Sequence, residues 1–456
     1  MYGFGYSLYN RTPFLGGGSG FDPAAQAFIS AAGITGVTQQ TAINNLVKGL
    51  KADGLWSKMK AVYPFVTDNR NLLSYTEDIT NAAWLKVNVS VTANTTIAPD
   101  GTTTADTFQN TGVSGAFLIQ KDIAKSAGTY TQSFYFKKNN NDWVAMYTSD
   151  NGANYAIAWF NVNTGVVGTV SAVGNFSAAT SAITNVGSGW YRCSLTFTKP
   201  LTSLTDTSAL IPVADNSLVS VIGKNAFIWG TQIETGSILT TYQPMLGSVQ
   251  AFIASQFKYN LVNPVDSDAA FRLVFNGGWT HSSNGATPNG TNGFANTYLT
   301  PSSVLTQNSA SIGAYLRTNN TFDYCDIGSA NLPTYVNGLY LFYNVVTNKD
   351  YSRNNNSVGS GGTTTGSNGF IVNKRTTSND MKIIRNNSLT LTNGNPTTGL
   401  STSPIYISAM NHGGTSELFS NRQTAFNFIS EGLTDTEAAN LYTRVQAYQT
   451  ALSRNV

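Results

Sequence analysis

The sequence predicts an all-β protein made of two-sheet β-sandwiches, with a few short helices near the N-terminus and one C-terminal helix. Two features of the composition favour strands: charged residues make up only 11% of the chain, and aromatic residues make up 12%. Asn, Thr, Ser and Gly replace the missing charges, and this mixture suits short strands joined by polar turns. The third observation is a recurring alternation of apolar and polar residues, which is typical of half-buried strands. A chain of 456 residues is long enough for two or three such domains.

The helical signals come first along the chain. Asp22 followed by Pro23 predicts the start of one helix, and Thr38 opens a second. A third short helix is predicted after Gly54 and ends at Pro64, because apolar residues recur there at spacings of three and four. These helices have too few apolar residues to bury their faces among themselves. We therefore expect them to pack on a larger surface elsewhere in the chain.

Strand follows strand from residue 71 to residue 244. The segments GTYTQSFYFKK, GWYRCSLTF and NAFIWGTQIE each alternate apolar and polar residues, and turn clusters such as APDGTT separate the runs. Many strands at this spacing predict a sandwich of the jelly-roll type. A second β-rich region follows Met245 and contains a hairpin turning on Asn386 and Asn387, residues that tolerate positive φ. The chain closes with a helix whose Thr434 and Glu437 form a capping box.

The bulk composition also argues against several classes of protein. A net charge of +3, spread along the chain, predicts no binding of nucleic acid. No apolar run approaches the ~20 residues of a membrane helix, and the N-terminus lacks the pattern of a signal peptide. Cys193 and Cys325 are the only cysteines, so neither a disulfide framework nor a zinc site built from cysteines is expected. We expect no cofactor.

Long motifs carry two resemblances. DPAAQAFISAAGIT, DAAFRLVFNGGWTHSSNGATPNGTNGFANT and GLTDTEAANLYTRVQAYQTALSRNV resemble successive pieces of a bacteriophage virion protein family with a concanavalin A-like, LamG-like sandwich. Between them, NLLSYTEDITNAAWLKVNVSVTANTTIAPDGTTTADTF, NVGSGWYRCSLTFT and AFIWGTQIETGSILTTYQP resemble a carbohydrate-binding-module-like jelly roll of phage tail and fibre proteins. The resemblances imply four parts: an N-terminal arm, a possible virion anchor (1–20); the helical first part of the lectin-like domain (21–66); the inserted jelly roll (67–245); and the concanavalin A-like sandwich with its C-terminal helix (246–456).

Candidate catalytic groups are few, and neither resemblance implies catalytic residues. His281 precedes Ser282 and Ser283, but neighbours on one polar loop do not form a triad, which needs base and nucleophile on separate elements. A hydrogen-bonded loop histidine is the interpretation we favour for His281, and His412 is interpreted as a turn residue. We therefore expect that the chain is not an enzyme.

Two pairs of carboxylates are candidates for glycoside hydrolysis, which needs two acids flanking a cleft. The first pair is Asp266 and Asp268, and the second is Asp323 and Asp326. Capping of a helix or turn explains the first pair better, although a loop of this kind could also ligate Ca²⁺. Nothing else in the sequence supports a catalytic role for the second pair. We assign no metal site.

Sugar binding asks for aromatic rings that stack on a pyranose and for side chains that pair with its hydroxyls. The candidate residues lie in adjacent predicted strands of the inserted domain, with polar residues 139–142 and Asn151 nearby: Trp143, Tyr147, Tyr155 and Trp159. If they share the solvent face, they form a platform. The alternative, which we favour at this point, is that half of them belong to the core, as we also expect for Trp190 and Trp229.

The first residues of the chain are a candidate anchor. The aromatic residues of the Gly-rich arm would become ordered against a larger assembly, and a frayed terminus is the equally favoured alternative. The anchor candidates are Tyr2, Phe4, Tyr6 and Tyr9.

Three functions follow as hypotheses. The first is a phage virion protein, a fibre, spike or decoration protein, that binds host cell-surface glycans, contacts other virion proteins through its arm, and forms a homo-oligomer such as a trimer. Location in a virion would also explain why a chain of extracellular composition has neither an export signal nor disulfides. The second is a purely architectural capsid, collar or tail decoration protein without sugar binding. The third, which the scarcity of acid–base groups disfavours, is a polysaccharide depolymerase.

Overall fold

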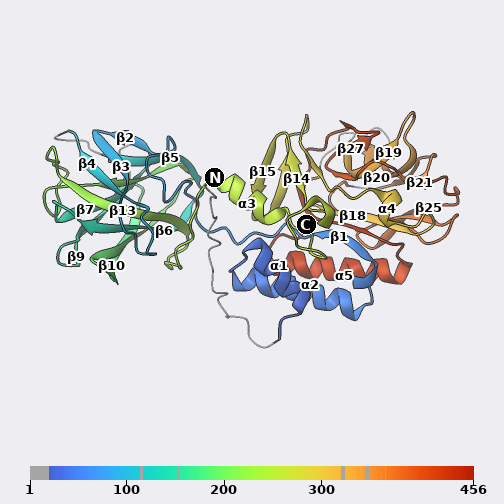
Figure 1. Cartoon of the computed structure of the whole chain (residues 1–456), viewed down its shortest axis with the longest axis horizontal. Helices are drawn as coiled ribbons and strands as arrows, with labels where there is room; N and C mark the ends of the chain where they lie inside the picture. The colour runs from blue at the N-terminus through green and yellow to red at the C-terminus, as the bar shows by residue number, and fades with distance from the viewer. Residues whose placement is uncertain (1–19, 113–116, 151–153, 320–323, 345–348, 365) are drawn as a thin grey trace, which may run out of the picture. The chain divides into compact units, whose positions relative to one another are not determined.

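The computed structural model describes residues 20–112, 117–150, 154–319, 324–344, 349–364 and 366–456. The chain forms two compact units (Figure 1): Asn69–Phe252, the inserted unit, and the residues up to Asp68 together with Ile253–Val456, the split unit. Each unit contains two β-sheets. The predicted fold class, an all-β chain with one sandwich inserted into another and a few helices, is confirmed. The limits and roles given above to the four parts of the chain stay predictions.

The inserted unit is a sandwich of two antiparallel sheets, with the orders β10-β11-β6-β13-β4-β3 and β2-β5-β12-β7-β8-β9. Its strands are β2 (Leu85–Val87), β3 (Val89–Thr96), β4 (Ala105–Asn110), β5 (Phe117–Lys125), β6 (Gly128–Lys138), β7 (Trp143–Ser149), β8 (Tyr155–Asn161), β9 (Val166–Val173), β10 (Ser177–Gly187), β11 (Trp190–Lys199), β12 (Ser203–Leu210) and β13 (Asn225–Thr235).

The core of the inserted unit lies between these sheets, where alternate residues of each strand point inward. Phe134 and Phe136 of β6 are fully buried there, and the Trp84 ring packs edge-on against Phe134 with centroids 6.4 Å apart. Trp190 and Trp229 are also buried, as expected, but they pack in a separate cluster with Tyr135. The sheet that contains β6 therefore buries aromatic residues on both faces.

The split unit contains two larger sheets. The first has the order β15-β16-β29-β18-β23-β24-β25 with β1 paired to β29, and the second has the order β14-β17-β26-β19-β20-β21-β22 with β27 and β28 attached. Their strands are β1 (Met59–Tyr63), β14 (Val274–Asn276), β15 (Trp279–Ser282), β16 (Gly285–Pro288), β17 (Phe294–Asn296), β18 (Ala310–Leu316), β19 (Tyr324–Asn331), β20 (Val336–Asn344), β21 (Lys349–Asn356), β22 (Ser360–Thr363), β23 (Gly369–Arg375), β24 (Met381–Arg385), β25 (Ser388–Asn393), β26 (Tyr406–Ile407), β27 (Met410–His412), β28 (Thr415–Glu417) and β29 (Thr424–Ser430).

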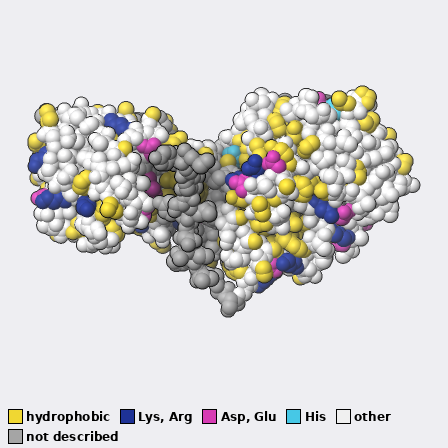
Figure 2. Space-filling model, in the orientation of Figure 1, with side chains coloured by type: hydrophobic (Ala, Val, Ile, Leu, Met, Phe, Trp, Pro, Cys, Tyr) yellow, Lys and Arg dark blue, Asp and Glu magenta, His cyan; other side chains and the backbone are white. Residues whose placement is uncertain are grey.

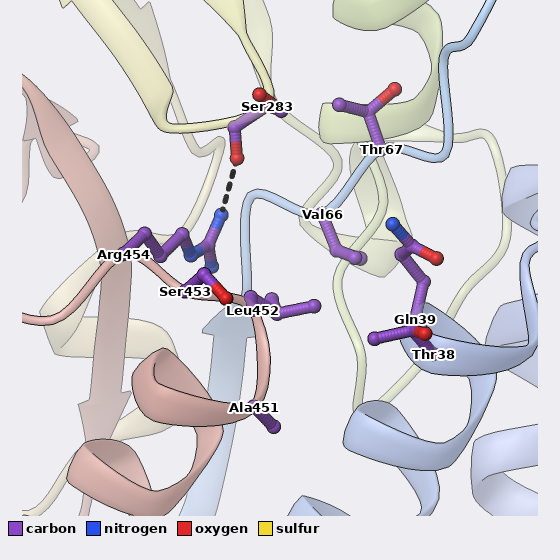
Figure 3. Close-up of a pocket in the computed structure, with 9 residues that line it drawn as sticks. All are labelled: Thr38, Gln39, Val66, Thr67, Ser283, Ala451, Leu452, Ser453 and Arg454. Atoms are coloured by element: carbon purple, nitrogen blue, oxygen red, sulfur yellow. Dashed lines mark hydrogen bonds between the residues drawn. The ribbon is translucent and has the colours of Figure 1, made fainter. Parts of the chain in front are cut away.

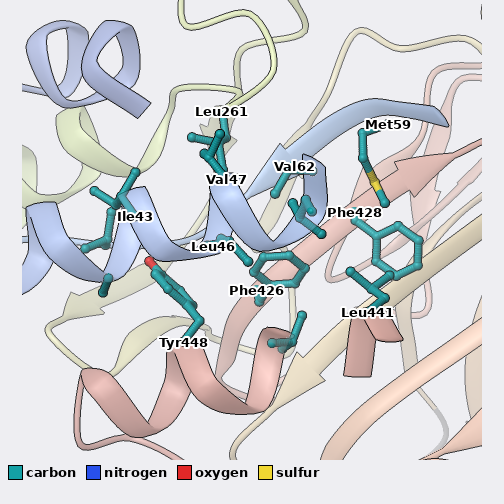
Figure 4. Close-up of a cluster of buried hydrophobic side chains, with 14 of the residues drawn as sticks. Ile43, Leu46, Val47, Met59, Val62, Leu261, Phe426, Phe428, Leu441 and Tyr448 are labelled. Atoms are coloured by element: carbon teal, nitrogen blue, oxygen red, sulfur yellow. The ribbon is translucent and has the colours of Figure 1, made fainter. Parts of the chain in front are cut away.

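Three helices of the split unit, α1 (Pro23–Ala32), α2 (Val37–Ala52) and α5 (Asp435–Ala451), pack on the sheet that contains β29. Figure 4 shows side chains of α2 and α5 meeting Phe426 and Phe428 of β29. The Asp22 carboxylate caps α1 by accepting from the Ala24 backbone N–H at 2.9 Å. The expectation that the N-terminal helices need a larger surface is confirmed, and the C-terminal helix shares that surface.

The prediction of a third helix after Gly54 is wrong. A short 3₁₀ turn (Trp56–Lys58) leads directly into β1, whose residue Val62 pairs with Phe428 of β29. The apolar residues that suggested a helix belong in part to this strand, and nearly all residues of the strand are buried. The remaining helical segments are α3 (Val249–Phe257), the 3₁₀ turn Asp268–Ala270 and α4 (Pro301–Val304). Within the described residues, no helix is both long and apolar enough to cross a lipid bilayer.

Candidate functional site

The four aromatic residues predicted to bind sugar lie on one face of the inserted unit. β7 and β8 are antiparallel neighbours, and paired residues share a face: Tyr147 is opposite Ile157, and Ser149 is opposite Tyr155. The alternate residues, such as Met146, point into the core. We call the outward side the aromatic face; it carries Trp143, Tyr147, Tyr155 and Trp159, which cluster with Ala145, Ile157 and Leu210 apart from the core. All four rings therefore lie on the side of the sheet that faces away from the main core, and Trp159 is buried within this second cluster.

The four rings differ in exposure. Tyr147 and Tyr155 are half-buried and adjacent, with ring centroids 5.3 Å apart and planes inclined by 30°. Trp143 is also half-buried, whereas Trp159 is only 4% exposed. The Trp159 indole N–H donates to the Ser217 carbonyl at 2.8 Å, and this bond holds the 211–222 loop against the sheet. The two tyrosines and Trp143 are therefore the rings that a ligand can reach.

Polar groups border the two tyrosines. The Asp206 carboxylate on β12 accepts from the Ser149 backbone N–H at 2.7 Å and from its hydroxyl at 3.1 Å. Burial raises the pKa of Tyr147, and the nearby charges of Asp206 and Asp150 raise it further, against a lowering by the Ser149 hydrogen bond. The Tyr147 hydroxyl thus stays protonated near neutral pH and can both donate and accept hydrogen bonds, as recognition of a sugar hydroxyl requires.

The polar residues expected beside the platform have other roles. Asn141 donates to the backbone oxygens of Trp143 at 2.6 Å and Pro212 at 2.9 Å, and Asp142 pairs with Lys138 at 2.7 Å. These contacts fix the turn before β7. Asn151 lies outside the described residues. Sequence reasoning missed Ser149 and Asp206, and only the alternation of β7 pointed to Ser149.

His281 is a strand residue and not the loop residue that the sequence suggested. It lies in β15, is 5% exposed, and packs edge-on against Phe275 with ring centroids 4.7 Å apart. Burial lowers its pKa to about 4, because the charged imidazolium loses its hydration there. His412, expected in a turn, ends β27 directly before the turn, and its Nδ1 lies 3.2 Å from a Glu417 carboxylate oxygen.

The candidate carboxylates form ion pairs in the split unit. Arg272 donates to Asp266 and to Asp268, each at 2.8 Å, and Lys258 also binds Asp266. The Lys258 and Arg272 hydrogen bonds hold the pKa of Asp266 below its usual value. Ion pairing with these basic side chains, and not capping, is therefore the role of this pair.

The second carboxylate pair cannot be compared as a pair, because Asp323 lies outside the described residues. Asp326 is 4% exposed, and its carboxylate is 2.7 Å from the guanidinium of the fully buried Arg422.

Among the described residues, no group of three or more His, Cys, Asp or Glu side chains gathers in a way that could hold a metal ion. Cys193 and Cys325 are both free and buried, one in each unit.

A small pocket of about 110 Å³ lies in the split unit, between the start of α2 and the chain after α5 (Figure 3). One wall is the buried Arg454, whose guanidinium donates to the backbone oxygens of Phe65 at 2.6 Å and Pro64 at 2.8 Å. Pockets that hold small-molecule ligands are typically larger, roughly 300 Å³ or more. The same guanidinium donates to the Ala425 backbone oxygen at 3.0 Å, so Arg454 ties three segments of the split unit together, and we assign this pocket no ligand. The anchor candidates Tyr2, Phe4, Tyr6 and Tyr9 lie outside the described residues.

Comparisons with known proteins leave the family open. No protein-family model matches the chain, and no curated protein matches it. Among solved structures, TmCBM61 in complex with β-1,4-galactotriose is 15% identical, with a TM-score of 0.24, over 37% of this chain and 100% of that chain. Domains LG4-5 of the mouse laminin α1 chain are 10% identical, with a TM-score of 0.23, over 74% of this chain and 89% of that chain. These carbohydrate-binding and laminin modules are β-sandwich proteins, and at such values they assign neither a family nor an activity.

The expectation that the chain is not an enzyme needs correction. The Trypanosoma rangeli sialidase in complex with sialic acid also matches, at 11% identity and a TM-score of 0.29, over 74% of this chain and 60% of that chain. Further sialidase structures match at 10% identity. The exclusion of enzymatic activity is therefore withdrawn, and this weak likeness assigns no reaction.

Proposed function

We propose that the chain is a glycan-binding protein whose inserted unit binds sugar on the aromatic face. The observation that carries this proposal is the placement of Trp143, Tyr147 and Tyr155 together on the outer side of a rigid sheet, accessible and separate from the core. Aromatic rings stack on the apolar faces of pyranose rings, and adjacent polar groups take the hydroxyls. Ser149 and Asp206 supply such polar groups beside Tyr147.

The setting that we infer for this activity is a bacteriophage particle. The resemblance of the flanking and inserted segments to phage virion proteins supports it, as does a composition poor in charge and cysteine. In this setting the arm contacts other virion proteins, and several copies of the chain, such as a trimer, present the aromatic face together. Linked copies convert weak contacts into avidity.

A glycan array with the purified full chain tests the binding proposal, followed by titration of any sugar that binds. Replacing Tyr147 and Tyr155 together with Ala is expected to weaken binding by about tenfold or more, because stacked rings dominate such contacts. The matched control is Phe294→Ala with Tyr406→Ala, a stacked pair of half-buried rings in the split unit with centroids 4.5 Å apart. The control pair should leave the affinity unchanged. An intact, folded chain that binds no glycan on the array would refute the proposal.

The proposed setting has its own test. Electron microscopy of phage particles labelled with an antibody against the chain should place it on the outside of the virion. Absence of the chain from purified particles would remove the virion role and leave the sugar binding to be judged separately.

A further inference from the structure

Positive charge is missing from the strands of the aromatic face. β7, β8 and β9 contain no Lys, Arg or His, and the sequence has no charged residue between Asp150 and Arg192. Arg192 belongs to the other sheet, where its guanidinium lies over the Tyr135 ring at 5.4 Å. Lys125, at the end of β5, is 1% exposed and donates to the Thr205 backbone oxygen at 3.1 Å. Neither of these cations is placed to meet a ligand on the aromatic face, and Lys138, near the start of β7, is paired with Asp142 at 2.7 Å.

Carboxylates border the aromatic face at both of its ends. Asp206 lies at the Tyr147 end, where it accepts from Ser149, and its charge acts on the Tyr147 hydroxyl. Asp215 lies at the Trp143 end. A side chain at Gly168 would collide there with both Trp143 and Asp215, which places the ring and the carboxylate side by side.

Asp215 also fixes the neighbouring strand. Its carboxylate accepts from the Thr169 backbone N–H at 2.7 Å and from the Thr169 hydroxyl at 3.1 Å. The negative charge at this end is therefore held in place by β9 and does not move freely with the 211–222 loop.

We propose that the glycan bound on the aromatic face is an uncharged polysaccharide segment and not one that carries carboxylates, such as sialic or uronic acids. This inference rests on the proposed function. A carboxylated sugar would lose hydration next to like charges, with no guanidinium or ammonium on these strands to pair with it, and that costs binding free energy. A neutral sugar brings only hydroxyl groups, which can donate to the Asp206 and Asp215 carboxylates in charge-assisted hydrogen bonds. The same carboxylates therefore favour one class of ligand and reject the other.

The test uses two sugars of equal length and the full chain. Calorimetric titration compares a neutral hexose trisaccharide with the same trisaccharide in which one ring is oxidised to the uronic acid. The acidic sugar is expected to bind about tenfold or more weakly, and the affinity for the neutral sugar should be nearly independent of salt, since no ion pair is formed. Equal or tighter binding of acidic sugars overturns the inference and leaves the proposed function standing. Failure of every neutral and acidic glycan on the array overturns the proposed function itself.

A charge-adding variant separates charge from shape. Ser171 on β9 is half-buried and pairs with Ile157, which pairs with Tyr147, so all three residues share the aromatic face. Ser171→Arg should strengthen binding of the acidic trisaccharide about threefold or more, with little change for the neutral one. Thr184→Arg, at an exposed position of β10 on the other sheet, is the control and should change neither affinity. If Ser171→Arg leaves the gap between the two sugars unchanged, charge does not set the preference and the inference is wrong.

Discussion

A buried ion pair in the split unit predicts a large effect of one isosteric substitution. The Arg385 guanidinium donates to the Asp350 carboxylate through Nε at 2.8 Å and through Nη2 at 2.6 Å. The exposed fractions of the side chains are 0% for Asp350 and 5% for Arg385. Asp350→Asn keeps the volume but removes the negative charge, so Arg385 would stay buried without its carboxylate. We expect the free energy of unfolding of the split unit to fall by about 3–5 kcal/mol.

The size of this loss follows from the geometry. Two unit charges about 4 Å apart, at an effective dielectric constant of about 20, attract each other by ~4 kcal/mol. Both charges have lost their hydration in the folded chain, and their mutual attraction offsets this cost. Removing one charge therefore leaves the desolvation free energy of the other uncompensated. Arg385→Met combined with Asp350→Leu removes both charges and fills the space with apolar atoms, and this double variant should lose less stability than the sum of its two single variants.

Urea unfolding of the full chain, fitted with a separate transition for each unit, measures these free energies. The double-mutant cycle needs the wild type, the two single variants Asp350→Leu and Arg385→Met, and the double variant, and Asp350→Asn is measured beside them. Additive losses in this cycle, or a loss below about 1 kcal/mol for Asp350→Asn, would refute the reasoning, because either result means that the two charges do not depend on each other.

Three further substitutions test other parts of the fold. Trp84→Ala empties a site that is 1% exposed in the core of the inserted unit and should cost about 3–5 kcal/mol of its unfolding free energy by urea titration; a loss below about 1 kcal/mol would contradict the packing. Thr434→Ala removes the hydrogen bond from the Glu437 backbone N–H and should cost about 1 kcal/mol, with Thr434→Ser as the control that keeps the cap. His281 has a folded pKa of about 4, below its unfolded value, so its contribution is complete above about pH 6.5 and is lost as the pH falls to 4, by about 3 kcal/mol. His281→Leu should flatten the stability of the split unit over that pH range, and an unchanged slope would contradict the assignment.

Local chemistry predicted the features that depend on neighbouring residues. The hairpin at Asn386 and Asn387 was predictable because both residues tolerate positive φ, and their φ angles are 47° and 63°. The capping box of α5 was equally visible in the sequence. The strand β1 was not, because Met59–Tyr63 becomes a strand only by pairing with β29 near the far end of the chain. Periodicity within a short segment carries no information about such a partner.

In the candidate site, too, local sequence predicts some features, whereas others depend on residues that are distant in the chain. Alternation along β7 places Trp143 and Tyr147 on one side, but it does not say whether that side faces the core. The other sheet of the inserted unit decides this, because it covers the opposite side of β7, where Met146 points into the core. The hydrogen bond between Trp159 and Ser217 joins β8 to a loop that is distant in sequence. The burial of Trp159 could therefore not be read from its own strand.

Some of the few charged side chains of this chain are buried, and this limits the part that surface charge can play in binding. Arg375, Arg422, Arg454 and Lys125 are each at most 1% exposed, so these four basic side chains are not available to a partner at the surface. On the face seen in Figure 2, basic and acidic side chains are scattered among uncharged ones. Such a surface does not steer partners over long distances, so its association rates should depend little on ionic strength. Under the proposed function, affinity for a sugar would then come from short-range stacking and hydrogen bonds on the aromatic face, with avidity added if copies of the chain are linked.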